Sequence, residues 1–170
     1  AKRRGDSPQD TTKTDGAWVT KPANEFMHDG RAVAKELLHY GLGKGDGVAF
    51  MCRTSYEGNV TDAAVVACGG VLATIYDTDS AEQIRNIVNN ADARLLIVQT
   101  TDMREKADGA IEDCPTLERI MCIESGALDE LKAYGSGVSD ATLDACNDSV
   151  KAPYLCSIVY TSGSTAAPQG

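Results

Sequence analysis

The chain is poor in aromatic residues and in histidine: 5% of its 170 residues are aromatic, and only His28 and His39 carry an imidazole. Its six cysteines are scattered, with no Cys-x-x-Cys pair and no histidine at the spacing of a zinc site. This pattern indicates reduced thiols in a cytosolic protein, rather than the disulfide framework of a small secreted domain. It also argues against a zinc centre.

The chain also has no excess of basic residues. Lysine and arginine number 16 against 25 acidic residues, which gives a net charge of -9 at pH 7. Nucleic-acid binding requires clustered positive charge, so we expect no nucleic-acid partner. No apolar run approaches the roughly 20 residues that span a membrane, and no basic start leads into an apolar signal segment. We therefore expect a cytoplasmic protein without a transmembrane segment; peripheral membrane contact and the oligomeric state stay open.

Two regions differ in composition. Residues 1–16 are polar and rich in lysine, arginine, aspartate, threonine and glycine, which predicts a mobile polar arm. Residues 17–170 have ordinary globular composition and contain no internal repeat and no evident linker. We interpret 17–170 as one α/β subdomain, with the stretch around Gly135 to Asp140 as a surface excursion.

Helical and strand patterns alternate along the chain. Helical periodicity predicts helices at 24–40, 56–68, 81–91 and 102–112, with broken helical stretches over 126–149. The helix at 81–91 has the sharpest signal, because Ser80 and Gln83 form a capping box before an apolar stripe. Short apolar runs predict strands at 48–52, 71–76, 94–98, 119–123 and 155–160. Strands separated by helices predict an α/β fold with a mostly parallel sheet and helices on both faces.

The segment after the last predicted strand is rich in glycine and hydroxyl side chains. Residues 160–170 read Tyr-Thr-Ser-Gly-Ser-Thr-Ala-Ala-Pro-Gln-Gly. Small residues let backbone N–H groups converge on phosphate oxygens, and hydroxyl groups add further donors. The segment lacks the spacing of a Walker A loop and of a dinucleotide fingerprint. On composition alone, an ordinary polar surface loop is the favoured interpretation.

The order of residues in this segment closely resembles the signature loop of the adenylate-forming superfamily, Y-T-S-G-[ST]-T-G-x-P-K-G. The resemblance extends upstream through 48–57 and 71–84 and covers about 17–170, with bacterial long-chain fatty acyl-CoA ligases the most similar in character. It implies the N-terminal subdomain of an enzyme that joins a fatty acid to coenzyme A, using ATP and Mg²⁺ through an acyl-adenylate. By this resemblance, the contacts to the nucleotide phosphates are Thr161, Ser162, Gly163, Ser164, Thr165 and Gly170.

Two positions depart from the family pattern. Ala166 stands where the family usually has glycine, which costs roughly 1 kcal/mol if that backbone needs a positive φ. Gln169 replaces the family's lysine, so a positive charge facing phosphate is lost and Gln169 is a weaker candidate contact. The adenine contacts, the magnesium-binding glutamate and the catalytic lysine of the family all lie downstream of this loop. We therefore expect the 170-residue chain to be a truncated part of the enzyme, inactive alone.

Other polar residues have simpler interpretations. Arg53 follows a predicted strand and is interpreted as a solvated charge at the strand end. Asp77, Asp79 and Glu82 could suggest a metal site, but capping and the dipole of the following helix explain them better. His28 and His39 are expected on the surface of the first helix.

Alternative functions remain open at this point. A ligase acting on an aryl acid or an amino acid would share this subdomain. A non-catalytic α/β module that binds a nucleotide or a partner, and a flavodoxin-like electron carrier, would share the layered fold.

Overall fold

The computed structural model describes residues 5–14, 16–127, 129 and 137–161. Twelve elements follow one another in this part of the chain. The helices are α1 (Ala23–His39), α2 (Tyr56–Ala67), α3 (Ala81–Asn90), α4 (Thr101–Asp108) and α6 (Asp140–Ser149). The strands are β1 (Pro8–Thr14), β2 (Ala17–Pro22), β3 (Gly47–Met51), β4 (Val71–Thr74), β5 (Ala93–Val98), β6 (Arg119–Cys122) and β7 (Ser157–Val159).

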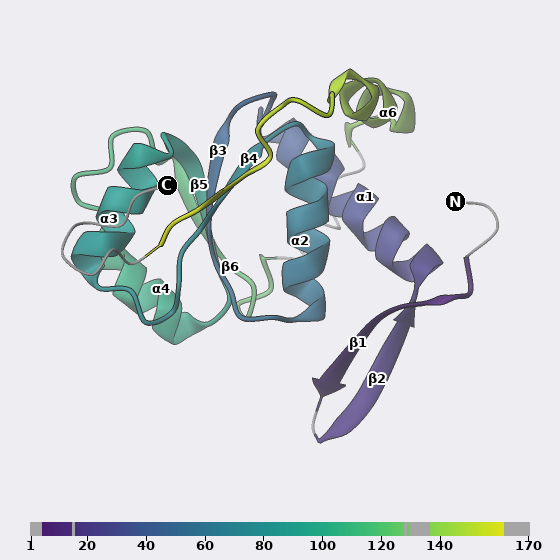
Figure 1. The fold of residues 1–170 in the computed structure, drawn as a ribbon, viewed down its shortest axis with the longest axis horizontal. Coiled ribbons are helices and arrows are strands. Elements are labelled where there is room, and N and C mark those ends of the chain that lie inside the picture. The colour runs from purple at the N-terminus through teal and green to yellow at the C-terminus, as the bar shows by residue number, and fades with distance from the viewer. Residues whose placement is uncertain (1–4, 15, 128, 130–136, 162–170) are drawn as a thin grey trace.

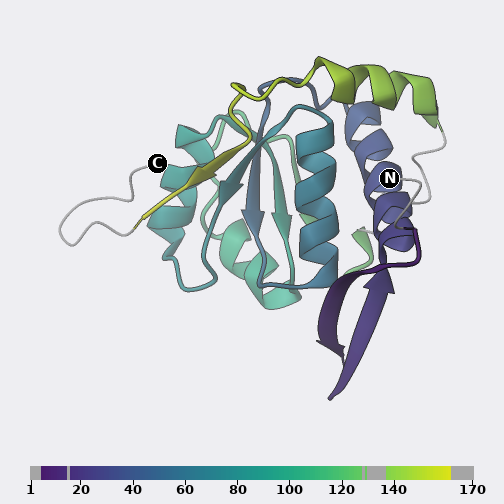
Figure 2. The same ribbon diagram turned by 45° about the vertical axis from the view of Figure 1, so that its right-hand side comes forward.

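Strands β3 to β7 form one parallel sheet in the order β6-β5-β3-β4-β7. Residues at alternate positions of the strands belong to two separate apolar clusters, one on each face. One cluster joins the sheet to α1 and α2, and the other joins it to α3 and α4. Figures 1 and 2 show the sheet between these helices. The α/β fold class predicted from the sequence is therefore confirmed.

The N-terminal region differs from the predicted polar arm. Residues 8–14 form β1, which pairs antiparallel with β2 in a hairpin that projects from the body of the molecule (Figures 1 and 2). Gly16 takes a φ of +83° beside the turn, and threonine-rich strands favour the extended backbone. The hydroxyl groups of Thr11 and Thr20 lie 3.0 Å apart across the strands. Composition indicated polarity correctly, but it concealed the pairing of the two threonine-rich segments.

Local capping agrees with the sequence at α3. The Ser80 hydroxyl accepts a hydrogen bond from Gln83 N at 3.2 Å, and Gln83 Oε1 accepts one from Ser80 N at 2.7 Å. This is the predicted capping box. Asp79 does not cap the helix; its carboxylate accepts a hydrogen bond from Tyr76 N in the preceding turn. His28 and His39 are exposed, as predicted.

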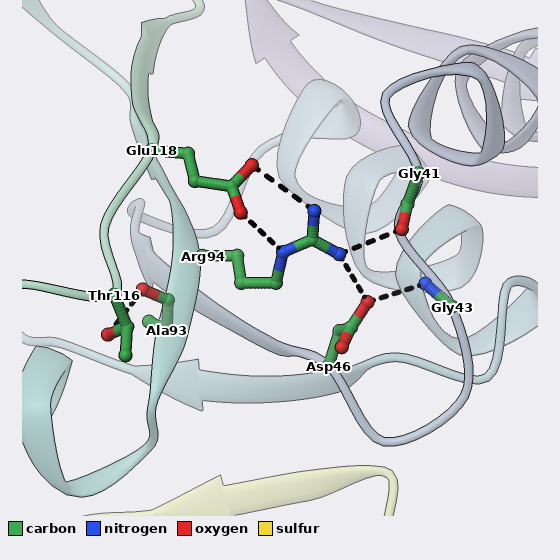
Figure 3. A network of polar contacts seen from close by, with 7 residues as sticks. All are labelled: Gly41, Gly43, Asp46, Ala93, Arg94, Thr116 and Glu118. Atoms are coloured by element: carbon green, nitrogen blue, oxygen red, sulfur yellow. Dashed lines mark hydrogen bonds and ion pairs between the residues drawn. The ribbon is translucent and has the colours of Figure 1, made fainter.

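At the amino ends of the strands, Arg94 joins three elements (Figure 3). Its guanidinium donates hydrogen bonds to both carboxylate oxygens of Glu118 at 2.8 and 3.2 Å. It also donates to Asp46 Oδ2 at 2.7 Å and to the carbonyl oxygen of Gly41 at 2.8 Å. The hydrogen bonds from Arg94 to Glu118 lower the pKa of the Glu118 carboxyl from its ordinary value. This planar, multiply paired arginine of β5 joins the segments that lead into β3 and β6.

Helix α6 is joined to α1 through charge. Asp140 Oδ1 lies 2.9 Å from Lys35 Nζ and from Arg31 Nη2, and Asp144 lies 2.7 Å from Arg31 Nη1. The hydrogen bond from Lys35, followed by that from Arg31, lowers the pKa of Asp140 to about 2. The predicted surface excursion around Gly135 falls partly outside the described residues.

Strand β7 is shorter than the predicted 155–160. It pairs on one side with β4 and lies at the edge of the sheet, and Leu155 before it is 60% exposed. Cys156, predicted in an apolar strand, is exposed for the same reason. The structure contains all six cysteines as free thiols.

Candidate functional site

The carboxyl ends of all five parallel strands lie along one edge of the sheet. Because the strands are parallel, the segments that follow Met51, Thr74, Val98, Cys122 and Val159 leave from the same side. In open α/β sheets, ligands bind outside this edge. The predicted phosphate-binding segment begins here, directly after β7.

One residue of the predicted phosphate contacts is described, Thr161. Its side chain is exposed at the carboxyl end of β7, where a hydroxyl can reach a ligand. The other predicted contacts lie outside the described residues, as do Ala166 and Gln169; these contacts are Ser162, Gly163, Ser164, Thr165 and Gly170. Their assignment stays a prediction.

Tyr160, the residue before this segment, is turned into the protein. Its side chain is 2% exposed and lies in the apolar cluster on the α3 and α4 face. Its hydroxyl donates a hydrogen bond to Asn90 Oδ1 at the end of α3, at 2.7 Å. Burial raises the pKa of Tyr160, so the phenol keeps its proton near neutral pH.

Two polar clefts of about 310 and 670 Å³ lie at the same edge and share Thr100 and Glu124 in their walls. The smaller one contains Arg53, which the sequence suggested was a solvated charge. Arg53 is indeed 71% exposed, but it also pairs with Asp77 at 2.7 Å. The structure thus brings Arg53 and Asp77 together from the ends of neighbouring strands.

Two further bonds fix this cleft. Lys106 Nζ donates to the carbonyl oxygen of Asp77 at 2.7 Å, and Arg53 N donates to Gln99 Oε1 at 2.9 Å. Lys106 and Gln99 were not singled out from the sequence. Gln99 follows β5 and Lys106 lies on α4. These positions were the available signal, because the topology of a parallel sheet places both near the carboxyl edge.

Glu124, two residues after β6, is hydrogen-bonded to the start of α4. It accepts hydrogen bonds from Thr101 N at 2.8 Å and from the Thr101 hydroxyl at 2.9 Å. The backbone bond from Thr101 is the first cause that lowers the pKa of Glu124. Glu124 therefore carries a negative charge at the shared wall of the two clefts.

The larger cleft is acidic. It contains Tyr56, whose hydroxyl donates to Asp29 Oδ2 at 3.2 Å, and whose pKa is raised mainly by burial. Within the part of the chain that the structure describes, no group of three or more histidine, cysteine, aspartate or glutamate residues could hold a metal ion. Among the described residues, no metal centre is therefore found at the acidic cleft or at Asp77, Asp79 and Glu82.

An apolar cleft lies elsewhere, between α1, α2 and α6, and includes Phe26, Met27 and Leu143. Its volume of about 150 Å³ is below the several hundred Å³ typical of small-molecule sites. No helix among the described residues is long and apolar enough to cross a membrane.

The fold is that of an α/β protein with a parallel sheet, and the glycine- and hydroxyl-rich segment begins at the carboxyl edge of that sheet. The family model described as "AMP-binding enzyme" matches residues 2–170. The chain belongs to this family.

Curated relatives are acyl-CoA ligases. The chain is 31% identical over 159 residues to the long-chain-fatty-acid–CoA ligase FadD15 of Mycobacterium bovis, covering 92% of this chain and 26% of the relative. It is 26% identical over 179 residues to the long-chain-fatty-acid–CoA ligase ACSBG2 of Xenopus laevis, covering 98% and 24%. The chain therefore spans about a quarter of the length of these relatives.

Solved structures share the fold. The inhibitor-bound N-terminal domain of FACL13 from Mycobacterium tuberculosis superposes with a TM-score of 0.73 at 20% identity, over 89% of this chain and 37% of that one. A fatty acyl CoA synthetase of the same organism gives a TM-score of 0.72 at 18% identity, over 88% and 28%. The N-terminal acyl-CoA synthetase fold expected from the sequence is confirmed.

Proposed function

We propose that this chain forms the N-terminal part of a long-chain fatty acid–CoA ligase. The observation that carries the proposal is the segment from Thr161 to Gly170, which has the family's phosphate-loop pattern and starts at the carboxyl edge of the sheet. The identity of 31% to a long-chain-fatty-acid–CoA ligase supports the same substrate class.

The proposed reaction has two steps. The fatty acid carboxylate attacks the α-phosphorus of ATP, forming an acyl-adenylate and releasing pyrophosphate. The thiol of coenzyme A then attacks the acyl carbon and releases AMP. In the first step, the hydroxyl of Thr161 and the following residues of the loop hold the departing phosphates and spread their charge over fixed donors.

The described residues fit one part of this chemistry. The exposed Thr161 supplies a hydroxyl donor at the edge where nucleotides bind in α/β sheets. Mg²⁺ would neutralise phosphate charge when bound, and we propose that its ligands, like the adenine contacts, lie downstream of this chain. A long acyl chain would also require a larger cavity than the apolar cleft of about 150 Å³. We accordingly expect the 170-residue chain to be inactive alone.

We further propose a cytoplasmic enzyme. Its substrate class makes peripheral membrane contact the natural route to the fatty acid, because long acyl chains partition into bilayers. Fractionation of cells into soluble and membrane material, with and without a high-salt wash, measures this directly. Protein that only detergent releases would contradict the proposal.

The decisive measurement is ATP–pyrophosphate exchange by the full-length gene product with fatty acids of several chain lengths. We expect exchange that depends on a long-chain acid, and none from residues 1–170. Thr161→Val should lower the exchange rate by about 10²-fold, as expected for the loss of one fixed donor. Thr11→Val, an exposed hydroxyl in the hairpin, is the matched control and should leave the rate unchanged.

The outcomes separate the alternatives. Exchange with aryl or amino acids only would overturn the fatty-acid assignment. Binding of ATP without exchange would favour a nucleotide-binding module without turnover. That alternative draws on Ala166 and Gln169, the two departures from the family loop.

A further inference from the structure

The end of the sheet that leads into the phosphate loop is held by few contacts. Strand β7 has three residues, pairs only with β4, and exposes Ser157 and Val159. Between 151 and 161, Ile158 is half-buried and Tyr160 is the one fully buried residue. The position of Thr161 therefore depends on how Tyr160 is fixed.

Tyr160 is fixed at both ends of its side chain. Its ring lies in the apolar cluster with Ile87 and Val88 of α3, and its hydroxyl donates to Asn90 Oδ1 at 2.7 Å. Asn90 is the last residue of α3 and is itself exposed, so the core does not require its side chain. The hydrogen bond to Tyr160 is the contact that its amide oxygen makes in the structure.

Helix α3 is a rigid platform for this contact. The capping box at Ser80 fixes its first turn, and Ile84, Ile87 and Val88 are at most 1% exposed. In Figures 1 and 2, β7 runs toward α3 at the edge of the sheet. The bond thus connects a firmly packed helix end to the point where the chain enters the loop.

We infer that Asn90 is a positioning residue for nucleotide binding, which acts through the Tyr160 hydroxyl to hold Thr161 at the point where the chain leaves the sheet. The inference rests on the proposed function and adds a residue that lies 70 positions before the loop. Asn90 does not touch the substrate in this role. Its contribution is to limit the orientations of Thr161 before ATP binds, so less ordering has to occur on binding.

The test uses the full-length enzyme and four variants of the pair. Asn90→Ala and Tyr160→Phe each remove the hydrogen bond, and we expect each to raise KM for ATP by about three- to tenfold, the range for one net hydrogen bond. KM for the fatty acid should stay unchanged. The double variant should raise KM for ATP no more than either single variant does, because both substitutions remove the same hydrogen bond. Asn90→Asp retains an acceptor oxygen and should restore the wild-type KM for ATP.

Asn89→Ala is the matched control. Asn89 is the neighbouring residue on α3, and its amide donates to the carbonyl oxygen of Asp113 at 3.0 Å, away from Tyr160. This variant damages the same helix end without affecting the pair. Equal increases in KM for ATP in Asn89→Ala and Asn90→Ala would overturn the inference and leave a purely structural role.

A second readout does not depend on turnover. Amide hydrogen exchange of residues 161–170, measured by mass spectrometry without ligand, should be faster in Asn90→Ala and Tyr160→Phe than in wild type and Asn89→Ala. Unchanged exchange in both variants would overturn the positioning role. If the wild-type enzyme lacks ATP–pyrophosphate exchange but the variants still alter amide exchange, the proposed function fails while the structural coupling stands.

Discussion

At the scale of single residues, the backbone of β3 shows how little space the sheet leaves. A Cβ atom added to Gly47 would lie 2.2 Å from the carbonyl oxygen of Ala91, a backbone atom that cannot turn away. Gly30, in the middle of α1, has no such neighbour within 4 Å. The same substitution should therefore have opposite effects at the two positions.

Gly47→Ala should lower the free energy of unfolding by about 1–3 kcal/mol, because the clash forces a backbone shift. Gly30→Ala should raise it by about 0.5–1 kcal/mol, because alanine favours the helix and no contact opposes it. Urea unfolding followed by circular dichroism measures both. A Gly47→Ala protein as stable as wild type would contradict the close approach of β3 to Ala91.

At the scale of elements, the sequence predicted most helices and strands but missed how some of them are joined. Periodicity located α1 to α4 and the five strands of the sheet, because apolar faces dictate them locally. The β1–β2 hairpin was missed because its threonines and exposed Trp18 give no apolar alternation. The ion pairs of α6 with Arg31 and Lys35 were also missed, since they join residues more than a hundred positions apart.

These ion pairs should make the attachment of α6 sensitive to acid. The pKa of Asp140 is about 2 in the folded protein, below its ordinary value of 3.8. Because the pKa of Asp140 is lower in the folded than in the unfolded protein, its ion pairs stabilise the fold fully when the pH is above the unfolded pKa of about 4. This stabilisation is lost as the pH falls from about 4 to about 2. The difference in urea midpoint between wild type and Asp140→Asn should therefore be present at pH 5 and narrow steadily toward pH 2.

Asp148→Asn, on the same helix, is the matched control because no ion pair is described for that carboxylate. Its midpoint should differ little from wild type at either pH. If the difference in urea midpoint between wild type and Asp140→Asn stays constant between pH 5 and pH 2, this would contradict the ion pairs of α6 with α1.

At the scale of the whole molecule, sequence reasoning identified the family. The loop pattern at 160–170 was sufficient for that, because it is a local signal. It could not reveal that Tyr160 contacts Asn90, or that Arg53 pairs with Asp77, since both depend on strand order. The polar clefts at the carboxyl edge likewise emerge only when β3, β5 and β6 are placed side by side.

Thiol reactivity offers a measure of the whole fold. Cys156 is exposed, whereas Cys68, Cys114 and Cys122 are buried, and burial raises the pKa of Cys68 to about 12. A disulfide-exchange reagent at neutral pH should modify Cys156 rapidly and the three buried thiols only on unfolding. All six should react in denaturant without a reducing agent. Fewer than six would reveal a disulfide and contradict the reduced state.

The position of β7 in the sheet also has a consequence for the order of folding. Strands β3 to β6 can associate through short β-α-β crossovers, but β7 must return across the sheet to pair Leu72–Thr74 with Ser157–Val159. Closing this long loop costs more conformational entropy than forming the shorter crossovers does, and only three paired residues of β7 offset that cost. We therefore expect the edge at β7 to be the last part of this sheet to become native, after β3 to β6 have formed.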